Sequence, residues 1–376
     1  MARSAWPTRA GLALLATISV GALAAPAQAA TTGVATVSGT KVQYKAASGK
    51  QNKVLITRSG NTITIDDQVA VKAGKGCKAV AGDKSKVRCT PSAAPTRVTV
   101  YTYDRVDTIV NSTDVRMTAD GGTGGDRITG GSRGDKIKGG SGADRISSLA
   151  GNDYVDGGTG NDTIAAGDGA DTLHGDTGND TLRGGNGDDT IFGEAGHDKL
   201  YGDAGSDILL GYQGRDRISG GADNDILYGD MSSDAVSADI LLGGSGVDTA
   251  DYSNYRKAVR VDLDGVADDG RPGEKDRVGA DIEAIEGGLG DDTLTGNSSF
   301  NFLTGGLGDD VLRGGAGNDS LDGSAGRDKL YGESGDDILY GVDEPAGADR
   351  LDGGTNGAVG DDCFRGRGDT ATACEP

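Results

Sequence analysis

The sequence predicts an all-β protein built mostly from short stacked repeats. Three observations indicate this fold class: an aspartate recurs every nine residues over twelve units, an aliphatic residue follows each of these aspartates by two positions, and 68 of the 376 residues are glycine. A unit of nine residues with one aliphatic side chain cannot bury an apolar core alone, so neighbouring units have to stack.

The composition alone is also compatible with disorder, because glycine is abundant, the net charge is −21 and aromatic residues make up only 4%. A disordered linker has no reason to keep aspartates and aliphatic residues in phase over twelve units. The regular spacing therefore favours an ordered repeat.

The first 29 residues are expected to be a secretory signal peptide. Arg3 and Arg9 precede a 15-residue apolar stretch at 11–25, and Ala27-Gln28-Ala29 matches the small-residue cleavage pattern. The alternative is an uncleaved N-terminal anchor, although the stretch is short for a membrane span. We expect an exported, extracellular chain with no membrane span after cleavage.

Residues 30–119 are predicted to form a small β domain. Two runs of alternating polar and apolar residues within 53–71 flank Ser59-Gly60-Asn61, which is typical of a hairpin. Residues 97–110 are predicted to be a strand followed by a degenerate turn of the repeat.

Charge is distributed unevenly. Residues 30–119 contain 14 Lys and Arg and 6 Asp, a net charge of +8, whereas residues 120–376 contain 21 Lys and Arg and 52 Asp and Glu, a net charge of −31. So acidic a region repels nucleic acid and anionic membranes and attracts cations. The basic segment is either a site for an anionic partner or a solvated face.

The four cysteines form two close pairs, and three connectivities are open. The local bridges Cys77–Cys89 and Cys363–Cys374 are favoured in an oxidising compartment. A zinc site is the alternative, but neither pair has C-x-x-C spacing and the chain contains only two histidines.

The repeat unit, as in GGTGNDTIA (157–165) and GGLGDDVLR (305–313), resembles the nonapeptide of RTX, or haemolysin-type, calcium-binding proteins. The resemblance covers about two thirds of the chain and implies a parallel β-roll. Six residues form a turn, three form a strand, and two units complete an 18-residue coil. It implies two roll blocks, at 120–248 and 287–352.

By the same resemblance, calcium lies between stacked turns and is bound by aspartates 18 residues apart and by turn carbonyls. The implied ligands are Asp126, Asp135, Asp144, Asp153, Asp162, Asp171, Asp180, Asp189, Asp198, Asp207, Asp216, Asp225, Asp239, Asp248, Asp292, Asp310, Asp319, Asp328, Asp337 and Asp349.

Departures from the motif predict local defects. Arg133 and Asp223 replace the fourth-position glycine, which places the ions of Asp135 and Asp225 in doubt, and Asn301 replaces a ligand. Asp361 and Asp362 follow an irregular linker and are left out of the ligand set.

The chemistry of the unit agrees with calcium. Glycines permit positive φ, and calcium takes six to eight oxygen ligands, including carboxylates and carbonyls. Two carboxylates about 5 Å apart repel by roughly 3 kcal/mol at an effective dielectric of 20. A divalent cation reverses that effect, so metal binding is expected to supply folding free energy.

Two segments differ from the repeats. Residues 249–286 are predicted to be an insert with a strand at 258–265 and an acidic loop at 264–277 that lacks EF-hand spacing. Residues 353–376 are predicted to be a disulfide-closed cap that covers an open sheet end.

Outward positions of the first block predict an apolar strip comprising Phe192, Ile208, Leu210, Ile226 and Tyr228. Such a strip is typical of a contact surface. The alternative is that the insert or the second block covers it.

Catalysis is not expected. His174 and His197 lie inside repeats and form no H-E-x-x-H site, and the G-x-S-x-G match at 130–134 lies in a glycine repeat. The sequence predicts a secreted calcium-binding protein with a structural or adhesive role and a cell-surface or matrix partner. Two alternatives stay open: a secreted enzyme, or a surface adhesin, with the repeats as a calcium-dependent folding module.

Overall fold

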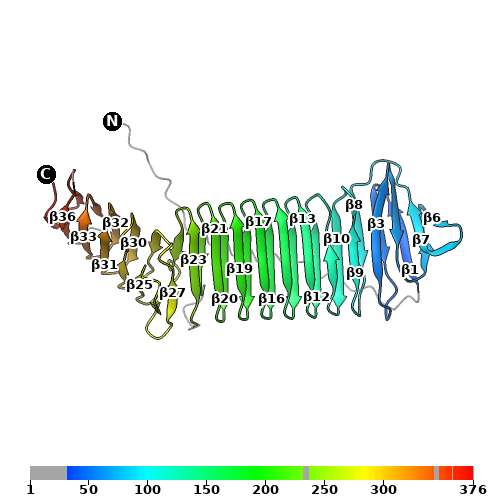
Figure 1. Cartoon of the computed structure of the whole chain (residues 1–376), viewed down its shortest axis with the longest axis horizontal. Coiled ribbons are helices and arrows are strands. Elements are labelled where there is room, and N and C mark those ends of the chain that lie inside the picture. Colours follow the sequence, from blue (N-terminus) through cyan, green and yellow to red (C-terminus); the bar gives the residue numbers. More distant parts are fainter. Residues whose placement is uncertain (1–31, 232–236, 343–346, 358, 376) are drawn as a thin grey trace.

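The computed structural model describes residues 32–231, 237–342, 347–357 and 359–375. The predicted signal peptide lies outside the described residues. Every regular element in these ranges is a β-strand, and the strands stack side by side into a long rod (Figure 1). No helix among the described residues is long and apolar enough to cross a membrane.

The described strands form three sheets, which we call A, B and C. Sheet A contains, in spatial order, β5 (Val71–Ala73), β1 (Gly33–Ser38), β2 (Lys41–Lys45), β8 (Arg97–Tyr101), β10 (Met117–Thr123), β12 (Lys136–Ser141), β14 (Tyr154–Thr159), β16 (Thr172–Thr177), β18 (Thr190–Ala195), β20 (Ile208–Gln213), β22 (Ile226–Tyr228), β24 (Thr249–Asp251), β28 (Ala284–Glu286), β30 (Phe302–Leu307), β32 (Ser320–Ala325), β34 (Ile338–Gly341) and β37 (Asp362–Arg365).

Sheet B contains β6 (Cys77–Val80), β7 (Asp83–Cys89), β4 (Thr62–Asp66), β3 (Lys53–Ser59), β9 (Thr108–Asn111), β11 (Arg127–Thr129), β13 (Arg145–Ala150), β15 (Thr163–Asp168), β17 (Thr181–Asn186), β19 (Lys199–Ala204), β21 (Arg217–Ala222), β23 (Ile240–Ser245), β27 (Asp276–Val278) and β26 (Ala267–Asp269). Sheet C contains β25 (Arg260–Asp262), β29 (Thr293–Thr295), β31 (Val311–Ala316), β33 (Lys329–Gly335), β35 (Arg350–Asp352) and β38 (Thr370–Thr372), with β36 (Thr355–Asn356) paired to β33.

The repeats form the predicted all-β parallel β-roll. Successive units alternate between the two facing sheets, so each strand pairs in parallel with the strand 18 residues away, as Ile137 does with Val155 in sheet A and Ile146 with Ile164 in sheet B. The eighth residue of each unit points into the core. In the first block these residues are Ile128, Ile137, Ile146, Val155, Ile164, Leu173, Leu182, Ile191, Leu200, Leu209, Ile218 and Leu227, all buried.

Glycine is required where coils stack most closely. Gly140, at the second position of its unit, has φ +114°, and a Cβ there would overlap the carbonyl oxygen of Gly122 one coil earlier. Both the backbone conformation and the lack of space exclude an ordinary side chain.

The sheets run through the boundaries predicted at residues 119, 248 and 286. β8 pairs in parallel with β10, and β9 pairs in parallel with β11, so residues 97–111 are already coils of the roll. The hairpin predicted within 53–71 is confirmed as the antiparallel pair β3–β4.

The insert changes one sheet and leaves the other intact. Sheet A continues through β24, β28 and β30, whereas sheet B ends on β27 and β26, and sheet C begins with β25. The predicted strand in 258–265 is β25.

Both predicted disulfides are confirmed, Cys77–Cys89 and Cys363–Cys374. The C-terminal residues extend the stack, because β37 pairs in parallel with β34 and β38 pairs in parallel with β35. The second bridge joins Cys363 of β37 to Cys374, close after β38.

Candidate metal centre

The sixth residue of each repeat is a buried acid, except Asn301 in the unit 296–304. All twenty aspartates predicted as ligands are at most 4% exposed. Each lies where the turn meets the strand, two positions before the aliphatic residue whose side chain packs in the core. Burial of so many carboxylates requires hydrogen bonds or a counter-charge.

One oxygen of each carboxylate is used to join coils. The backbone N–H of Asp144 donates to Oδ1 of Asp162 at 2.7 Å, and the N–H of Asp162 donates to Oδ1 of Asp180 at 2.7 Å. Repetition of this bond produces rows of side chains along the edges of the roll.

Four rows are formed by the described residues. Row 1 comprises Asn52, Asp107, Asp126, Asp144, Asp162, Asp180, Asp198, Asp216, Asp239 and Asp276. Row 2 comprises Met117, Asp135, Asp153, Asp171, Asp189, Asp207, Asp225, Asp248 and Glu283. Row 3 comprises Val259, Asp292, Asp310, Asp328, Asp349 and Asp369. Row 4 comprises Asn301, Asp319, Asp337 and Asp361.

The second carboxylate oxygen is buried without a hydrogen-bond partner among the described residues. This holds for Oδ2 of sixteen of the twenty predicted ligands, all but Asp135, Asp292, Asp328 and Asp349. An unpaired buried carboxylate oxygen is costly and rare in folded proteins. A row of them indicates a ligand that supplies positive charge.

Where the first residue of the unit is glycine, the space beside Oδ2 suits a hard cation. A Cβ on Gly175, the first residue of its unit, would lie 2.6 Å from Asp180 Oδ2 and 2.7 Å from the carbonyl oxygen of Gly193. A carboxylate and a carbonyl oxygen thus approach one space that the missing side chain keeps open. Oxygen ligands of these two kinds are those that calcium prefers, so the residues fit the ion.

Burial dominates the electrostatics of the rows. Burial, helped by the charges of neighbouring aspartates, raises the pKa of Asp144, Asp180 and Asp189 to about 7. Hydrogen bonds from backbone N–H groups oppose the rise only in part. A cation bound to Oδ2 would favour the charged form of the same groups.

The three departures from the motif, at Arg133, Asp223 and Asn301, affect their turns in different ways. Asp135 Oδ2 accepts the N–H of Gly131 at 2.7 Å, so the carboxylate after Arg133 is satisfied within its own turn. Asp225 Oδ2 has no such partner in the described chain. In its turn Asp223 adopts φ +75°, a positive φ like that of the glycine it replaces. Asn301 keeps its place in row 4 and accepts from Asn297.

The rows include acids that the sequence did not predict as ligands. These are Asp107, Asp276, Glu283, Asp361 and Asp369. Asp361, left out because its linker is irregular, is fully buried and accepts the N–H of Asp337 at 2.9 Å. Asp361 and Asp369 join the rows because β37 and β38 pair in parallel with β34 and β35. The spacing of residues in the sequence does not show this pairing.

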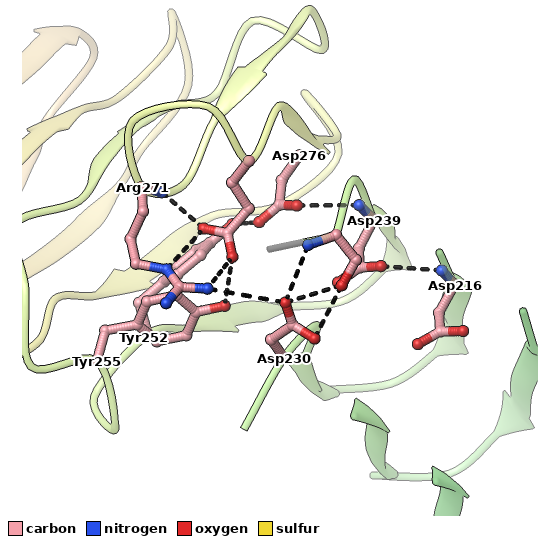
Figure 2. Close-up of polar contacts among 9 residues, drawn as sticks. Asp216, Asp230, Asp239, Tyr252, Tyr255, Arg271 and Asp276 are labelled. Carbon is pink, nitrogen blue, oxygen red and sulfur yellow. Dashed lines mark hydrogen bonds and ion pairs between the residues drawn. The ribbon is translucent and has the colours of Figure 1, made fainter. Parts of the chain in front are cut away.

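At the insert, row 1 passes from the repeats into a different environment (Figure 2). Asp239 donates its N–H to Asp276 Oδ1 at 2.9 Å, 37 residues later. Arg271 lies beside this pair, 2.7 Å from Glu274 Oε1 and 3.9 Å from Asp230 Oδ2. Burial, followed by nearby acids, raises the pKa of Asp239 to about 9 and that of Asp276 to about 8.

The same insert gathers three further acids, Asp262, Asp264 and Asp268, whose carboxylate oxygens lie within 4.8 Å of one another. Two of these side chains are exposed, as the predicted acidic loop implied.

The predicted apolar strip lies on the outer face of sheet A. Phe192 stacks on His174 with ring centroids 4.6 Å apart and lies 6.4 Å from Tyr212. His174 also pairs with Glu194 at 2.9 Å. Leu210 is only 7% exposed, and Phe192, Ile208, Ile226 and Tyr228 are half-buried. The strip is therefore a packed row rather than a freely exposed patch.

Comparison with known families agrees with the geometry. The sequence matches the family described as RTX calcium-binding nonapeptide repeat (4 copies) at residues 120–155, 147–182, 174–209, 201–236, 210–250, 286–321 and 313–343, which together span just over half of the chain. Among curated proteins, no relative matches the chain. The match and the parallel roll agree on the same residues, and the chain belongs to the family of RTX calcium-binding nonapeptide repeat proteins.

Proposed function

We propose that this chain is a secreted protein whose repeats fold into the β-roll on binding calcium outside the cell and then serve a structural or adhesive role. The observation that carries the proposal is the row of buried Oδ2 atoms without hydrogen-bond partners among the described residues. Each ion would be held by aspartates of stacked turns and by turn carbonyls.

Calcium acts in this proposal as the source of folding free energy. Each unit places one aliphatic side chain in the core and one carboxylate beside the next. Without metal, charged neighbours oppose stacking, and the carboxylates favour protonation instead. Because each aspartate joins two coils, binding at one site orders part of the next, and folding is expected to be cooperative.

Export is proposed from three features. The segment 1–29 has the composition of a signal peptide, and both disulfides favour an oxidising compartment. Calcium is scarce in the cytosol and plentiful outside, so the roll would form after export. N-terminal sequencing of protein recovered from the medium tests this, and a mature chain beginning at Ala30 is expected.

The central experiment compares the mature chain with calcium, after removal of calcium, and with magnesium in its place. Far-ultraviolet circular dichroism is expected to show β structure and a high melting temperature only with calcium. Magnesium demands a tighter octahedral site and is expected to give little structure. A metal-free sample with the full β signal and an unchanged melting temperature would overturn the proposal.

The adhesive role is proposed from the apolar strip on sheet A, where Phe192 stacks on His174. Binding of the calcium-loaded protein to cells or extracellular matrix is the test. Phe192→Asp is expected to reduce binding while calcium-dependent folding persists. Unchanged binding and unchanged self-association would remove this face from the proposal.

A further inference from the structure

The turn 279–283 of the insert continues row 2 although it is not a nonapeptide. The matched family leaves this turn uncovered, yet the turn connects β27 of sheet B to β28 of sheet A, as the repeat turns connect the two sheets. Glu283 lies two positions before Ile285, which is fully buried in the core. Ala250 pairs with Ile285, so Glu283 has the place that Asp248 has one coil earlier.

One hydrogen bond joins this turn to the last repeat of the first block. The backbone N–H of Asp248 donates to Glu283 Oε2 at 3.0 Å, in the way that Asp162 donates to Asp180. Asp248 is fully buried, and its Oδ2 lacks a hydrogen-bond partner in the described residues. A buried carboxylate of this kind needs a counter-charge or a proton.

The space beside Asp248 Oδ2 is open. Gly243, the first residue of that unit, does not have a positive φ, and a Cβ on it would lie 2.5 Å from Asp248 Oδ2 and would overlap the carbonyl oxygen of Asp281. The repeats direct a carbonyl of the next coil to the same space, as that of Gly193 does in the first block. Gly193 is the first residue of its unit, whereas Asp281 lies two residues before the acid position. The irregular turn therefore supplies the same kind of ligand from another position.

The charged groups of this seam, which we define as Gly243, Asp248, Asp281 and Glu283, are all acids. Burial, helped by the charges of Glu283 and Asp281, raises the pKa of Asp248 to about 6. Burial, helped by the charge of Asp281, also raises the pKa of Glu283. No ion pair of the described residues includes one of these three acids. The seam thus gathers negative charge that the described chain does not compensate.

The opposite edge of the insert provides the contrast. There row 1 ends at Asp276, and the guanidinium of Arg271 lies 2.7 Å from Glu274 Oε1 and 3.9 Å from Asp230 Oδ2 (Figure 2). A side-chain cation therefore compensates the acids on the row 1 edge. On the row 2 edge the described chain supplies oxygens and an open space instead.

We propose that Asp248 Oδ2, the carbonyl oxygen of Asp281 and the carboxylate of Glu283 bind a calcium-class divalent cation at the seam. Carboxylate and carbonyl oxygens suit such a hard cation, and Gly243 leaves the space for it. The ion would join the last repeat of the first block to an insert that lacks the nonapeptide. This inference rests on the proposed calcium-driven folding, and it adds a site with two ligands outside the repeats.

Ion counting and hydrogen exchange of the mature chain, both by mass spectrometry, test the seam. Glu283→Gln keeps an oxygen for the N–H of Asp248 but removes the charge. In saturating calcium this variant should bind one ion fewer than the wild type. Its peptides covering 276–290 should exchange faster, while peptides from 160–210 keep their protection. Glu283→Asp, which introduces the acid found in the repeats, should retain the ion.

Asp264→Asn is the matched control within the insert. Asp264 is exposed, and its Oδ1 accepts the N–H of Val266, which asparagine can also do. The control should bind as many ions as the wild type. If Asp264→Asn loses an ion and Glu283→Gln does not, the acidic loop binds the metal and the inference is wrong.

Gly243→Ala covers the case in which Glu283→Gln fails to fold, because it keeps every charge and fills only the space beside Asp248 Oδ2. It should also lose one ion and the protection of 276–290. An unchanged ion count in either folded variant, with repeats that still respond to calcium, would overturn the inference and leave the proposed function standing. If peptides from 160–210 of the wild type do not respond to calcium, the proposed function fails first.

Discussion

The backbone N–H of Asp162 donates to Oδ1 of Asp180 at 2.7 Å, and Asp180 Oδ2 is buried without a partner in the described chain. One carboxylate therefore has two roles, a structural bond to the preceding coil and an oxygen free to bind metal. Asn can perform the first role through its own oxygen but carries no charge for the second.

We predict that Asp180→Asn destabilises the folded protein when calcium is bound and stabilises it when calcium is absent. In saturating calcium it should lower the free energy of unfolding by about 3 kcal/mol, because a buried charged partner of the cation is lost. In calcium-free buffer it should favour the folded form, because a buried unpaired charge is removed. Thermal melts in both buffers measure the two effects.

Asp188→Asn is the matched control for that variant. Asp188 lies on a neighbouring turn, is exposed, and accepts the N–H of Ser206. Asn161 and Asn179 occupy the equivalent position in other coils, so the exchange is tolerated by the fold. Equal melting shifts for Asp180→Asn and Asp188→Asn would contradict a metal-binding role for row 1.

The pKa values predict opposite pH responses for the metal-free and calcium-loaded protein. Burial raises the pKa of Asp180 and Asp189 to about 7 in the folded chain, well above the value near 4 expected after unfolding. The folded form thus retains protons that the unfolded form releases. This contribution to stability is fully present below pH 4 and is lost as pH rises through 7.

Calcium-stripped protein is therefore expected to have more β structure at pH 4.5 than at pH 8. Calcium affinity should change the other way, falling as pH drops below 7, because protons compete for the same oxygens. Circular dichroism of stripped protein across this range and calcium titrations at each pH measure both trends. Stripped protein that loses structure on acidification from pH 8 would show that the raised pKa values are wrong.

The roll could be predicted from sequence because its period is a physical constraint. Eighth-position residues such as Leu182 and Leu200 pair across adjacent strands of one sheet, so any slip would expose the core. Aspartates in the same phase necessarily form rows. This logic holds wherever the nonapeptide is unbroken.

At the ends and the insert the sequence predicted single strands, such as β8 followed by a degenerate turn, but not which residues keep the repeat conformation there, because the conformation persists without the motif. Tyr103 and Arg105 adopt positive φ that glycine signals elsewhere, and Asp223 does so in a turn that we expected to be distorted. Aspartate tolerates this region better than most residues. Asp276 joins row 1 through pairing of β27 with β23, a contact that no local pattern reports.

A further prediction concerns the first glycine of the unit. Gly175 does not have a positive φ, so alanine imposes no backbone strain there, but its Cβ would occupy the space between Asp180 Oδ2 and Gly193 O. Gly175→Ala should weaken calcium binding at this coil and raise the calcium concentration needed for half-maximal folding by about tenfold, equivalent to about 1.4 kcal/mol.

Calcium titrations followed by circular dichroism measure that midpoint. Thr181→Ala, at a half-buried outward strand position close by, is the control and should leave it unchanged. A Gly175→Ala protein that folds at the wild-type calcium concentration would show that the space beside Oδ2 is not the binding site.

The last prediction tests whether the insert at 249–286 is stabilised by Arg271 independently of the aspartate rows. Arg271 is nearly buried, contacts Glu274 through its backbone N–H at 2.6 Å and its guanidinium at 2.7 Å, and lies 4.9 Å over the ring of Tyr255. Arg271→Met retains most of the volume but leaves Glu274 as a buried unpaired charge. We expect a loss of about 3–5 kcal/mol in the free energy of unfolding even in saturating calcium. Urea unfolding measures this loss, with the exposed Arg256→Met as control.

Adding Glu274→Gln to Arg271→Met should restore part of the loss, because the remaining carboxylate charge is removed. If the second substitution destabilises the protein further, the ion pair of Arg271 and Glu274 is not what stabilises the insert.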